Sequence, residues 1–244
     1  MNPASEMLEA HGLVKAYGGK RVVDRVDVMV NRQEIVGLLG PNGAGKTTTF
    51  YMVVGLTRPN EGRVFLDGMD ITQDPMFQRA RKGVSYLAQE PSVFRKLTVE
   101  QNLLAILEML RVPAQERRER LERGLRELSI DHLAKQKALS LSGGERRRLE
   151  ISRALVTEPR FMLLDEPFAG IDPMAINDIQ QIIRQLKNRG LGVIISDHNV
   201  RETLKVCDKA YIINQGRIIE QGSPNDIVNS ELARSVYLGE NFNL

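Results

Sequence analysis

Alternating and continuous apolar runs along the chain predict two kinds of β-strand. Every second residue of 25–30 (RVDVMV) is a valine, and 62–68 (GRVFLDG) repeats the alternation after a turn-rich stretch, as in strands with one buried face. Three other segments are apolar without interruption, which is typical of parallel strands buried on both faces. They are 34–40 (EIVGLLG), 161–166 (FMLLDE) and 191–197 (LGVIISD), and each ends in polar residues or glycine.

Helical segments separate these continuous strands. One of them, 172–190, ends on a glycine, as helices often do. Strands that alternate with helices indicate a parallel α/β sheet with right-handed crossovers, which binds ligands at the carboxyl ends of its strands. A hairpin at 210–222 (AYIINQGRIIEQG) and short helices complete the chain.

From about residue 91 to residue 157 the pattern is helical only. Segment 98–112 opens with a capping box of Thr98 and Gln101. The next helix has three glutamate–arginine pairs at i,i+4 spacing, namely Glu116–Arg120, Glu119–Arg123 and Glu122–Arg126. We therefore expect one α/β domain over 1–244. Residues 1–90 and 158–244 would form its core with an antiparallel β subdomain, and 91–157 an inserted helical subdomain.

Composition and charge place the protein among soluble globular domains. The chain has 244 residues, of which 42% are hydrophobic and 27% charged, with a formal net charge of +3. That charge is too small to indicate nucleic-acid binding, and the single Cys207 fits a reducing compartment. The first residues lack the pattern of a signal peptide, and no apolar run approaches the ~18 residues of a membrane span. We expect a protein that is cytosolic or that reaches a membrane only through a partner.

The clearest chemical signal is GPNGAGKT at 40–47, between an expected strand and an expected helix. Its glycines let several N–H groups turn inward as an anion nest, beside the positive end of the helix. We expect Lys46 to contact the β- and γ-phosphates and Thr47 to offer its hydroxyl to Mg²⁺. A glycine-rich turn without a ligand is the alternative. The expected nucleotide-binding residues are Gly40, Asn42, Gly43, Ala44, Gly45, Lys46, Thr47 and Thr48.

Polar residues at three strand ends supply the remaining chemistry. We expect Asp165 to hold Mg²⁺ and its neighbour Glu166, on an extended strand end, to face the attacking water as general base. In the alternative, Glu166 only caps the following turn. His198 follows the third continuous strand, where its imidazole would contact the γ-phosphate unless its role is structural. Gln89, after GVSYLA, would reach Mg²⁺ or the water.

A second glycine turn lies in LSGGERRR at 141–148. Ser142 and Glu145 fit a capping box, which does not account for Gly143 and Gly144. Each glycine in a helix costs up to ~1 kcal/mol relative to alanine. Both fit a helix N-terminus that a phosphate approaches closely. The sequence leaves open whether this phosphate belongs to the same subunit or to another.

LSGGE, the phosphate motif before it and LLDEP after it resemble the ATP-binding-cassette (ABC) ATPases, a P-loop NTPase family, over essentially the whole chain. The resemblance implies ATP and Mg²⁺ as cofactors. It implies a head-to-tail homodimer in which Ser142 and Gly144 touch the γ-phosphate bound by the other subunit. It also implies adenine stacking on Tyr17, an interface position for Asp172 and a switch role for His198.

Within this family, FYMVVG (50–55) and the terminal VYLGENFNL resemble the ATPase subunits of bacterial lipopolysaccharide exporters. This implies a homodimer on the cytoplasmic face of the inner membrane that drives two membrane-embedded permease subunits and touches neither the cargo nor nucleic acid. Phe94 and Arg95, close to Gln89, are expected to contact a partner helix. In the alternative, Phe94 packs inside the helical subdomain.

Three other functions fit the sequence less well. The ATPase subunits of branched-chain amino-acid importers share much of the pattern and are the nearest alternative. An ABC clamp acting on DNA would carry long coiled coils between the phosphate motif and LSGGE, where this chain has only short helices. A P-loop kinase or GTPase would leave Gly143 and Gly144 unexplained.

Overall fold

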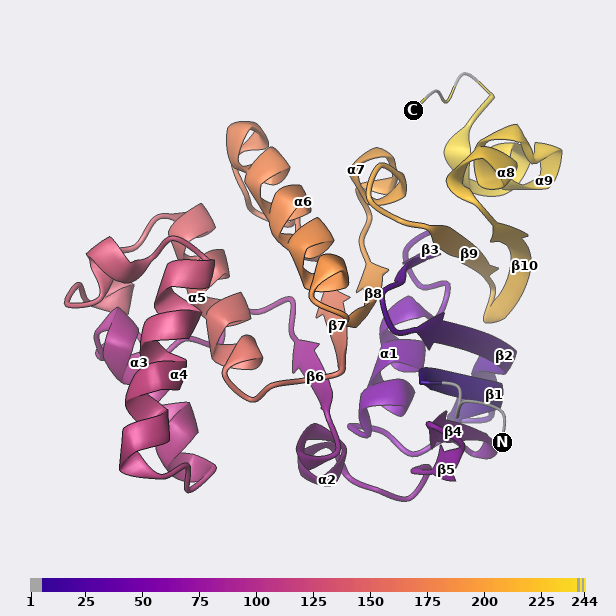
Figure 1. The fold of residues 1–244 in the computed structure, drawn as a ribbon. Helices are drawn as coiled ribbons and strands as arrows, with labels where there is room; N and C mark the ends of the chain where they lie inside the picture. Colours follow the sequence, from indigo (N-terminus) through magenta and orange to yellow (C-terminus); the bar gives the residue numbers. More distant parts are fainter. Residues whose placement is uncertain (1–5, 241, 243) are drawn as a thin grey trace.

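Five parallel strands form the centre of a six-stranded sheet in the computed structural model, which describes residues 6–240, 242 and 244 (Figure 1). The expectation about a signal peptide therefore falls partly outside the described residues. Every residue of β3, β7 and β8 is buried, as the continuous apolar runs predicted. In sheet order the strands are β10 (Arg217–Gly222, antiparallel), β9 (Lys209–Asn214), β3 (Ile35–Leu39), β8 (Gly192–Ser196), β7 (Phe161–Asp165) and β6 (Val84–Leu87).

A second, antiparallel sheet is built from the alternating strands. Its order is β2 (Lys20–Asn31), β1 (Met7–Tyr17), β4 (Glu61–Leu66) and β5 (Met69–Asp70). Val26, Val28 and Val30 are buried while the residues between them are exposed. The buried face shares one apolar cluster with helix α1 (Lys46–Val54) and the parallel sheet. This packing fixes the turn that leads from β3 into α1.

Three helices form the inserted helical subdomain, at the left of Figure 1. They are α3 (Val99–Met109), α4 (Ala114–Glu127) and α5 (Gly143–Leu155), with short 3-10 turns at Asp131–Leu133 and Ala138–Ser140. The capping box of Thr98 and Gln101 is confirmed. The subdomain shares an apolar cluster with the core, and the predicted boundaries at 90/91 and 157/158 stay predictions.

The remaining helices cover the parallel sheet or follow its last strand. Helix α6 lies between the helical subdomain and α7, and α8 and α9 lie beside β10 (Figure 1). Their bounds are α2 (Met76–Arg81), α6 (Pro173–Asn188), α7 (Val200–Leu204), α8 (Pro224–Asn229) and α9 (Glu231–Ala233), followed by a π-helical turn at Arg234–Leu238. Among the described residues, no helix combines the length and the apolar character that crossing a membrane requires.

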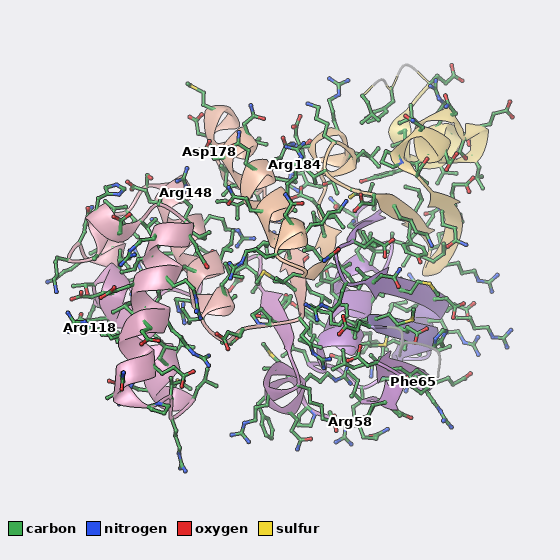
Figure 2. All side chains as sticks on the ribbon, viewed as in Figure 1. Arg58, Phe65, Arg118, Arg148, Asp178 and Arg184 are labelled. Atoms are coloured by element: carbon green, nitrogen blue, oxygen red, sulfur yellow. The ribbon has the colours of Figure 1, made fainter. Side chains whose placement is uncertain are left out.

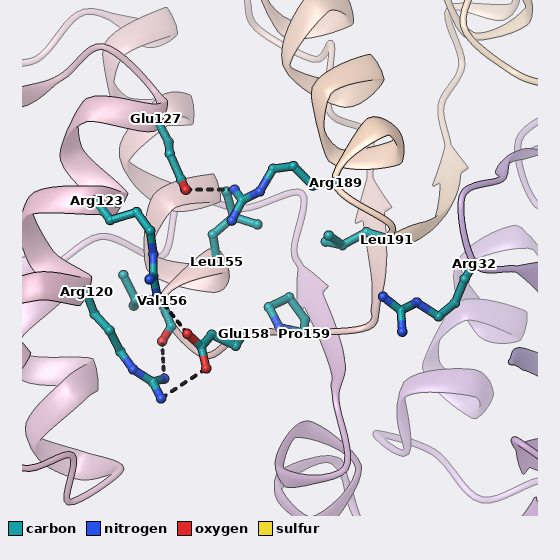
Figure 3. A pocket seen from close by; sticks show the side chains of 11 residues that line it. Arg32, Arg120, Arg123, Glu127, Leu155, Val156, Glu158, Pro159, Arg189 and Leu191 are labelled. Atoms are coloured by element: carbon teal, nitrogen blue, oxygen red, sulfur yellow. Dashed lines mark hydrogen bonds and ion pairs between the residues drawn. The ribbon is translucent and has the colours of Figure 1, made fainter. Parts of the chain in front are cut away.

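Charged side chains cross the cleft between the helical subdomain and the core, whose cavity measures about 300 Å³ (Figure 3). Glu127 of α4 accepts a hydrogen bond from Arg189, at the end of α6, at 2.7 Å. Glu158 binds Arg123 at 2.7 Å and Arg120 at 3.0 Å. The predicted pair of Glu119 with Arg123 is therefore wrong, because Glu158 lies across the cleft and bridges both arginines. The other two predicted pairs form.

A further ion pair joins α5 to α6. Arg148 of α5 donates to Asp178 of α6 at 2.6 Å, and Figure 2 labels both side chains. Its arginine is partly exposed and its carboxylate more so, as in the pairs of the cleft, so solvent screens the attraction. The apolar cluster shared by the two parts, rather than these pairs, supplies most of their attachment.

Candidate active site

The turn from β3 into α1 forms a cradle of backbone N–H groups. Gly45, the N-cap of α1, has a left-handed backbone with φ of 109°, and a Cβ there would lie 2.7 Å from the carbonyl oxygen of Val22. Only glycine fits without displacing β2. No side chain caps this end of α1, so its first N–H groups are available to an anion.

Lys46 folds back over this cradle. Its Nζ donates to the carbonyl oxygens of Gly40 at 2.7 Å and Pro41 at 3.0 Å. Burial lowers the pKa of Lys46, while the charges of Glu166 and Asp165 oppose that shift. The ammonium thus lies among carbonyls that a phosphate oxygen can replace. Thr47 and Asn42 are exposed beside it, and Thr48 is half-buried.

The carboxyl ends of neighbouring parallel strands bring the three predicted catalytic residues together. Gln89 follows β6, Glu166 follows β7 and His198 follows β8. The amide of Gln89 donates to Oε2 of Glu166 at 2.7 Å, and Nδ1 of His198 lies 3.5 Å from the same oxygen. An amide, a carboxylate and an imidazole therefore meet at one edge of the sheet, where an attacking water can be held.

The two adjacent carboxylates occupy different surroundings. Asp165, the last residue of β7, is buried and accepts a hydrogen bond from the Tyr86 hydroxyl at 3.1 Å. Burial raises the pKa of Asp165, which is the effect expected for a carboxylate in a low-dielectric site. Glu166 is half-buried, and its carboxylate contacts Gln89 and His198 instead.

The expectation that Glu166 continues an extended strand is wrong. Its φ is +46°, in the left-handed region, and its N–H donates to the carbonyl oxygen of Ser196 at 2.6 Å. Such a backbone costs of order 1–3 kcal/mol in a non-glycine residue and persists where the surroundings impose it. The sharp turn, rather than strand alternation, separates the two carboxylates.

Asp197 was not predicted to belong to the site. It is fully buried, and its carboxylate accepts the N–H groups of Phe168 at 3.0 Å and Asn199 at 2.8 Å. Burial raises its pKa. Asp197 thereby ties the segment that follows Glu166 to the segment that carries His198. Its position at the end of a continuous apolar strand was a signal available in the sequence.

The second glycine turn begins α5. The capping box is confirmed: Ser142 Oγ accepts from the N–H of Glu145 at 3.3 Å, and the Glu145 carboxylate accepts from the N–H of Ser142 at 2.8 Å. A Cβ on Gly143 or Gly144 would meet only Gly170 O and Ala175 Cβ respectively, both at 3.5 Å, which is ordinary contact. Neither glycine has a positive φ, so nothing in the described chain requires them.

Four further residues expected to contact nucleotide or protein lie at the surface. Tyr17, at the end of β1, is 52% exposed. Asp172 is the exposed N-cap of α6. Phe94 is 42% exposed and its neighbour Arg95 is exposed too, which excludes the alternative in which Phe94 packs inside the helical subdomain. Each of the four side chains is accessible to another molecule.

Comparison with known proteins gives one consistent answer. The profile of the ABC transporter family matches residues 23–169. The chain is 54% identical to the lipopolysaccharide export system ATP-binding protein LptB of Haemophilus influenzae, over 98% of this chain and 99% of the relative. It is 53% identical to LptB of Escherichia coli K12, over 97% and 99%.

Solved structures agree with the sequence relatives. The ADP conformation of MJ1267, an ATP-binding cassette of an ABC transporter, superposes with a TM-score of 0.86 at 30% identity, over 96% of this chain and 99% of that one. A nucleotide-free ATP-binding cassette from an ABC transporter also gives 0.86. The chain therefore belongs to the ATP-binding subunits of ABC transporters and is an ATPase whose hydrolysis is coupled to transport.

Proposed function

We propose that the chain is the ATPase subunit of a lipopolysaccharide exporter, in which two copies pair head to tail around two ATP molecules. Relatives named for lipopolysaccharide export, at 53–56% identity over nearly the full length, support this cargo over the importer and DNA-clamp alternatives. The subunit would bind two membrane-embedded permease subunits at the cytoplasmic face of the inner membrane. The lipid would not touch it.

One observation carries the paired arrangement. Gly143 and Gly144 stand at an exposed helix N-terminus without a steric reason inside the described chain. Their neighbours belong to the stretch Gly170–Ala175 rather than to the cradle at 40–47. A phosphate brought by a second copy explains both glycines, because it must approach N–H groups that a Cβ would shield. Each copy then holds half of two sites.

The cradle fits the triphosphate of ATP together with Mg²⁺. Gly45 packs the cradle directly against β2, and no side chain caps the N–H groups of α1 that face it. The hydroxyl of Thr47, the carboxylate of Asp165 and the amide oxygen of Gln89 are the oxygen donors that Mg²⁺ prefers. Bound there, Mg²⁺ would neutralise charge on the β- and γ-phosphates. Lys46 would exchange its carbonyl partners for phosphate oxygens, and Tyr17 would stack on the adenine.

Hydrolysis is assigned to the edge where β6, β7 and β8 end. Glu166 would accept a proton from the attacking water, and its contacts with Gln89 and His198 support that role. Both neighbours can hydrogen-bond the same water and fix its direction toward the γ-phosphate. From the opposite subunit, Ser142 and Gly144 would complete the site.

Phe94 and Arg95 are proposed to grip a helix of the permease subunits. An exposed aromatic ring beside an arginine is a common hot spot of protein interfaces. Both residues follow Gln89 closely along the chain. A movement of Gln89 on binding or loss of the γ-phosphate would therefore occur close to the surface that the permease would contact.

The test is Glu166→Gln in the purified chain and in the complex isolated with mild detergent. We expect ATP binding to persist, turnover to fall roughly 100-fold or more as for loss of a general base, and an ATP-bound dimer to accumulate on gel filtration. Glu119→Gln, at an exposed position of α4, is the matched control and should behave as the parent. Unimpaired hydrolysis would remove Glu166 from its role. If the isolated complex contained amino-acid permease subunits, the proposed cargo would be amino acids rather than lipopolysaccharide.

A further inference from the structure

The segment from Ala88 to Arg95, which includes Gln89, joins the candidate active site to the proposed permease contact. Both ends matter to the proposed function, on which this inference rests. Helix α5, whose N-terminus carries LSGGE, contacts the segment through three charged side chains that lie along one face of the helix. These are Arg147, Glu150 and Arg153.

Arg147 makes the first contact, at the beginning of the segment. Its guanidinium donates to the carbonyl oxygen of Ala88 at 3.1 Å and to that of Asp165 at 3.3 Å. The side chain is only 6% exposed. Arg147 therefore fixes α5 to the ends of β6 and β7 together, next to Gln89 and Glu166.

Glu150 makes the second contact. The residue is 4% exposed, and each carboxylate oxygen has its own donor. Oε2 accepts from Arg147 at 3.0 Å, and Oε1 accepts from the N–H of Ser92 at 3.0 Å. Loss of Arg147 would leave the buried carboxylate without its cationic partner, and loss of Ser92 would leave one of its buried oxygens without a donor. The link between α5 and Ser92 is therefore stiff.

Arg153 makes the third contact, one turn further along α5. It donates to the carbonyl oxygen of Ser92 at 2.5 Å, and its guanidinium lies 4.6 Å from the centre of the Phe94 ring. Ser92 is thus held by α5 at both its N–H and its carbonyl. On the other side, the buried Asn102 of α3 binds the N–H and the carbonyl oxygen of Phe94 at 2.8 and 3.1 Å.

We propose that Glu150, together with Arg147 and Arg153, is a positioning residue that makes the surface around Phe94 move as one body with α5. The N-terminus of α5 is the part of each subunit that would engage the ATP held by the other subunit. The permease contact on one copy would therefore follow the nucleotide bound to its twin, rather than only the nucleotide bound to itself. Glu150 touches no substrate in this scheme.

The test uses a fluorescent probe beside Phe94 in the full-length chain. Lys96, which is exposed, is replaced by cysteine and labelled with an environment-sensitive dye, with Cys207→Ser and Glu166→Gln in the same chain to hold the ATP-bound dimer. The measured quantities are the ATP-induced fluorescence change, the ATP affinity and the dimer fraction. We expect Glu150→Gln to reduce the fluorescence change by about 2- to 30-fold, the range for residues that couple two sites, at unchanged affinity and dimer fraction.

Two further variants keep the test decisive. Arg153→Met, at a partly exposed position, should reduce the same signal by a smaller factor even where Glu150→Gln folds poorly. Glu127→Gln removes the α4–α6 pair without touching the segment, and should leave the signal unchanged. A full signal in both Glu150→Gln and Arg153→Met, or an equal loss in Glu127→Gln, would overturn the relay. If the labelled chain without a change at Glu150 or Arg153 binds ATP yet stays monomeric, the result would instead overturn the proposed head-to-tail pairing of two copies.

Discussion

The cradle at 40–47 and the LSGGE turn at 141–145 are both glycine-rich helix starts, but their glycines have different causes. At Gly45 a positive φ and the nearby carbonyl of Val22 already require glycine inside the subunit. At Gly143 and Gly144 the backbone is ordinary and a Cβ would fit. Comparing them separates what the fold of one chain requires from what the proposed second subunit would require.

The two turns also differ in how their charges are satisfied. Around the cradle, burial shifts the pKa values of Lys46, Asp165 and Asp197 away from the charged forms. At the LSGGE turn, hydrogen bonds from Ser142 hold the pKa of Glu145 below its ordinary value. A nucleotide phosphate would compensate the ammonium of Lys46, and Mg²⁺ would compensate the carboxylate of Asp165. At the second turn the capping box already satisfies Ser142 and Glu145, and only free N–H groups remain.

The largest effect expected from this comparison is on turnover. Gly144→Ala should leave the isolated chain folded with an unchanged or slightly higher melting temperature, since alanine is the better helix former. ATP hydrolysis should nevertheless fall roughly 100-fold, the cost of displacing a reacting group by about 1 Å. Steady-state ATPase assays and thermal unfolding on the same preparation measure both. Normal turnover would show that no phosphate approaches this helix start.

The reverse result is expected at the cradle. Gly45→Ala forces a Cβ against β2 in a left-handed backbone and should lower the free energy of unfolding by about 1–3 kcal/mol. ATP binding should be lost with it, because the turn that aims the N–H groups is displaced. Chemical denaturation and a nucleotide-binding titration check this, with Gly68→Ala as a control at a positive-φ glycine that has open space around it. A Gly45→Ala protein that unfolds with the parent's free energy and still binds ATP would contradict the proposed difference between the two turns.

The smallest effects concern pH, and they have opposite signs at the two turns. Burial raises the folded-state pKa of Asp165 above its ordinary value of 3.8, so its charge destabilises the nucleotide-free fold at neutral pH. Asp165→Asn should raise the melting temperature at pH 7, and the gain should vanish below about pH 3.8, where the parent carboxyl is protonated in both states.

Glu145 provides the opposite sign. Its pKa is lowered from 4.5 by the N–H and hydroxyl of Ser142, so its stabilisation is present above that pH and is lost as the pH falls through the folded-state value. Glu145→Gln should therefore lower the melting temperature at pH 7 and have little effect in strong acid. Thermal unfolding between pH 3 and pH 8 compares both variants, and shifts of the same sign would contradict the assigned environments.

Much of the architecture follows from local patterns. The sequence predicts three kinds of feature directly, because alternation and cap spacing act within a few residues. They are the buried valines at 26, 28 and 30, the continuous apolar runs of β3, β7 and β8, and both capping boxes. The same holds for the cradle, whose motif carries its glycines and lysine in one short stretch.

Other features arise only when distant segments meet. Gln89, Glu166 and His198 converge because β6, β7 and β8 are neighbours in the sheet, and the left-handed turn of Glu166 depends on the carbonyl of Ser196. Arg123 pairs with Glu158 rather than with Glu119, because the fold places the Glu158 carboxylate within reach across the cleft.

The sequence by itself determined where the glycine-rich cradle lies, which strands are buried and where helices begin, since those properties depend on residue type and spacing. Only the tertiary structure decided that Glu150 and Arg153 hold Ser92 and Phe94, with Arg147 paired to Glu150. It also decided that Gly143 and Gly144 lack a reason within the described chain. Burial and contact are properties of the packed chain. From the sequence alone a charged residue in a helical run is predicted to face solvent, and only the fold shows which residues pack against it.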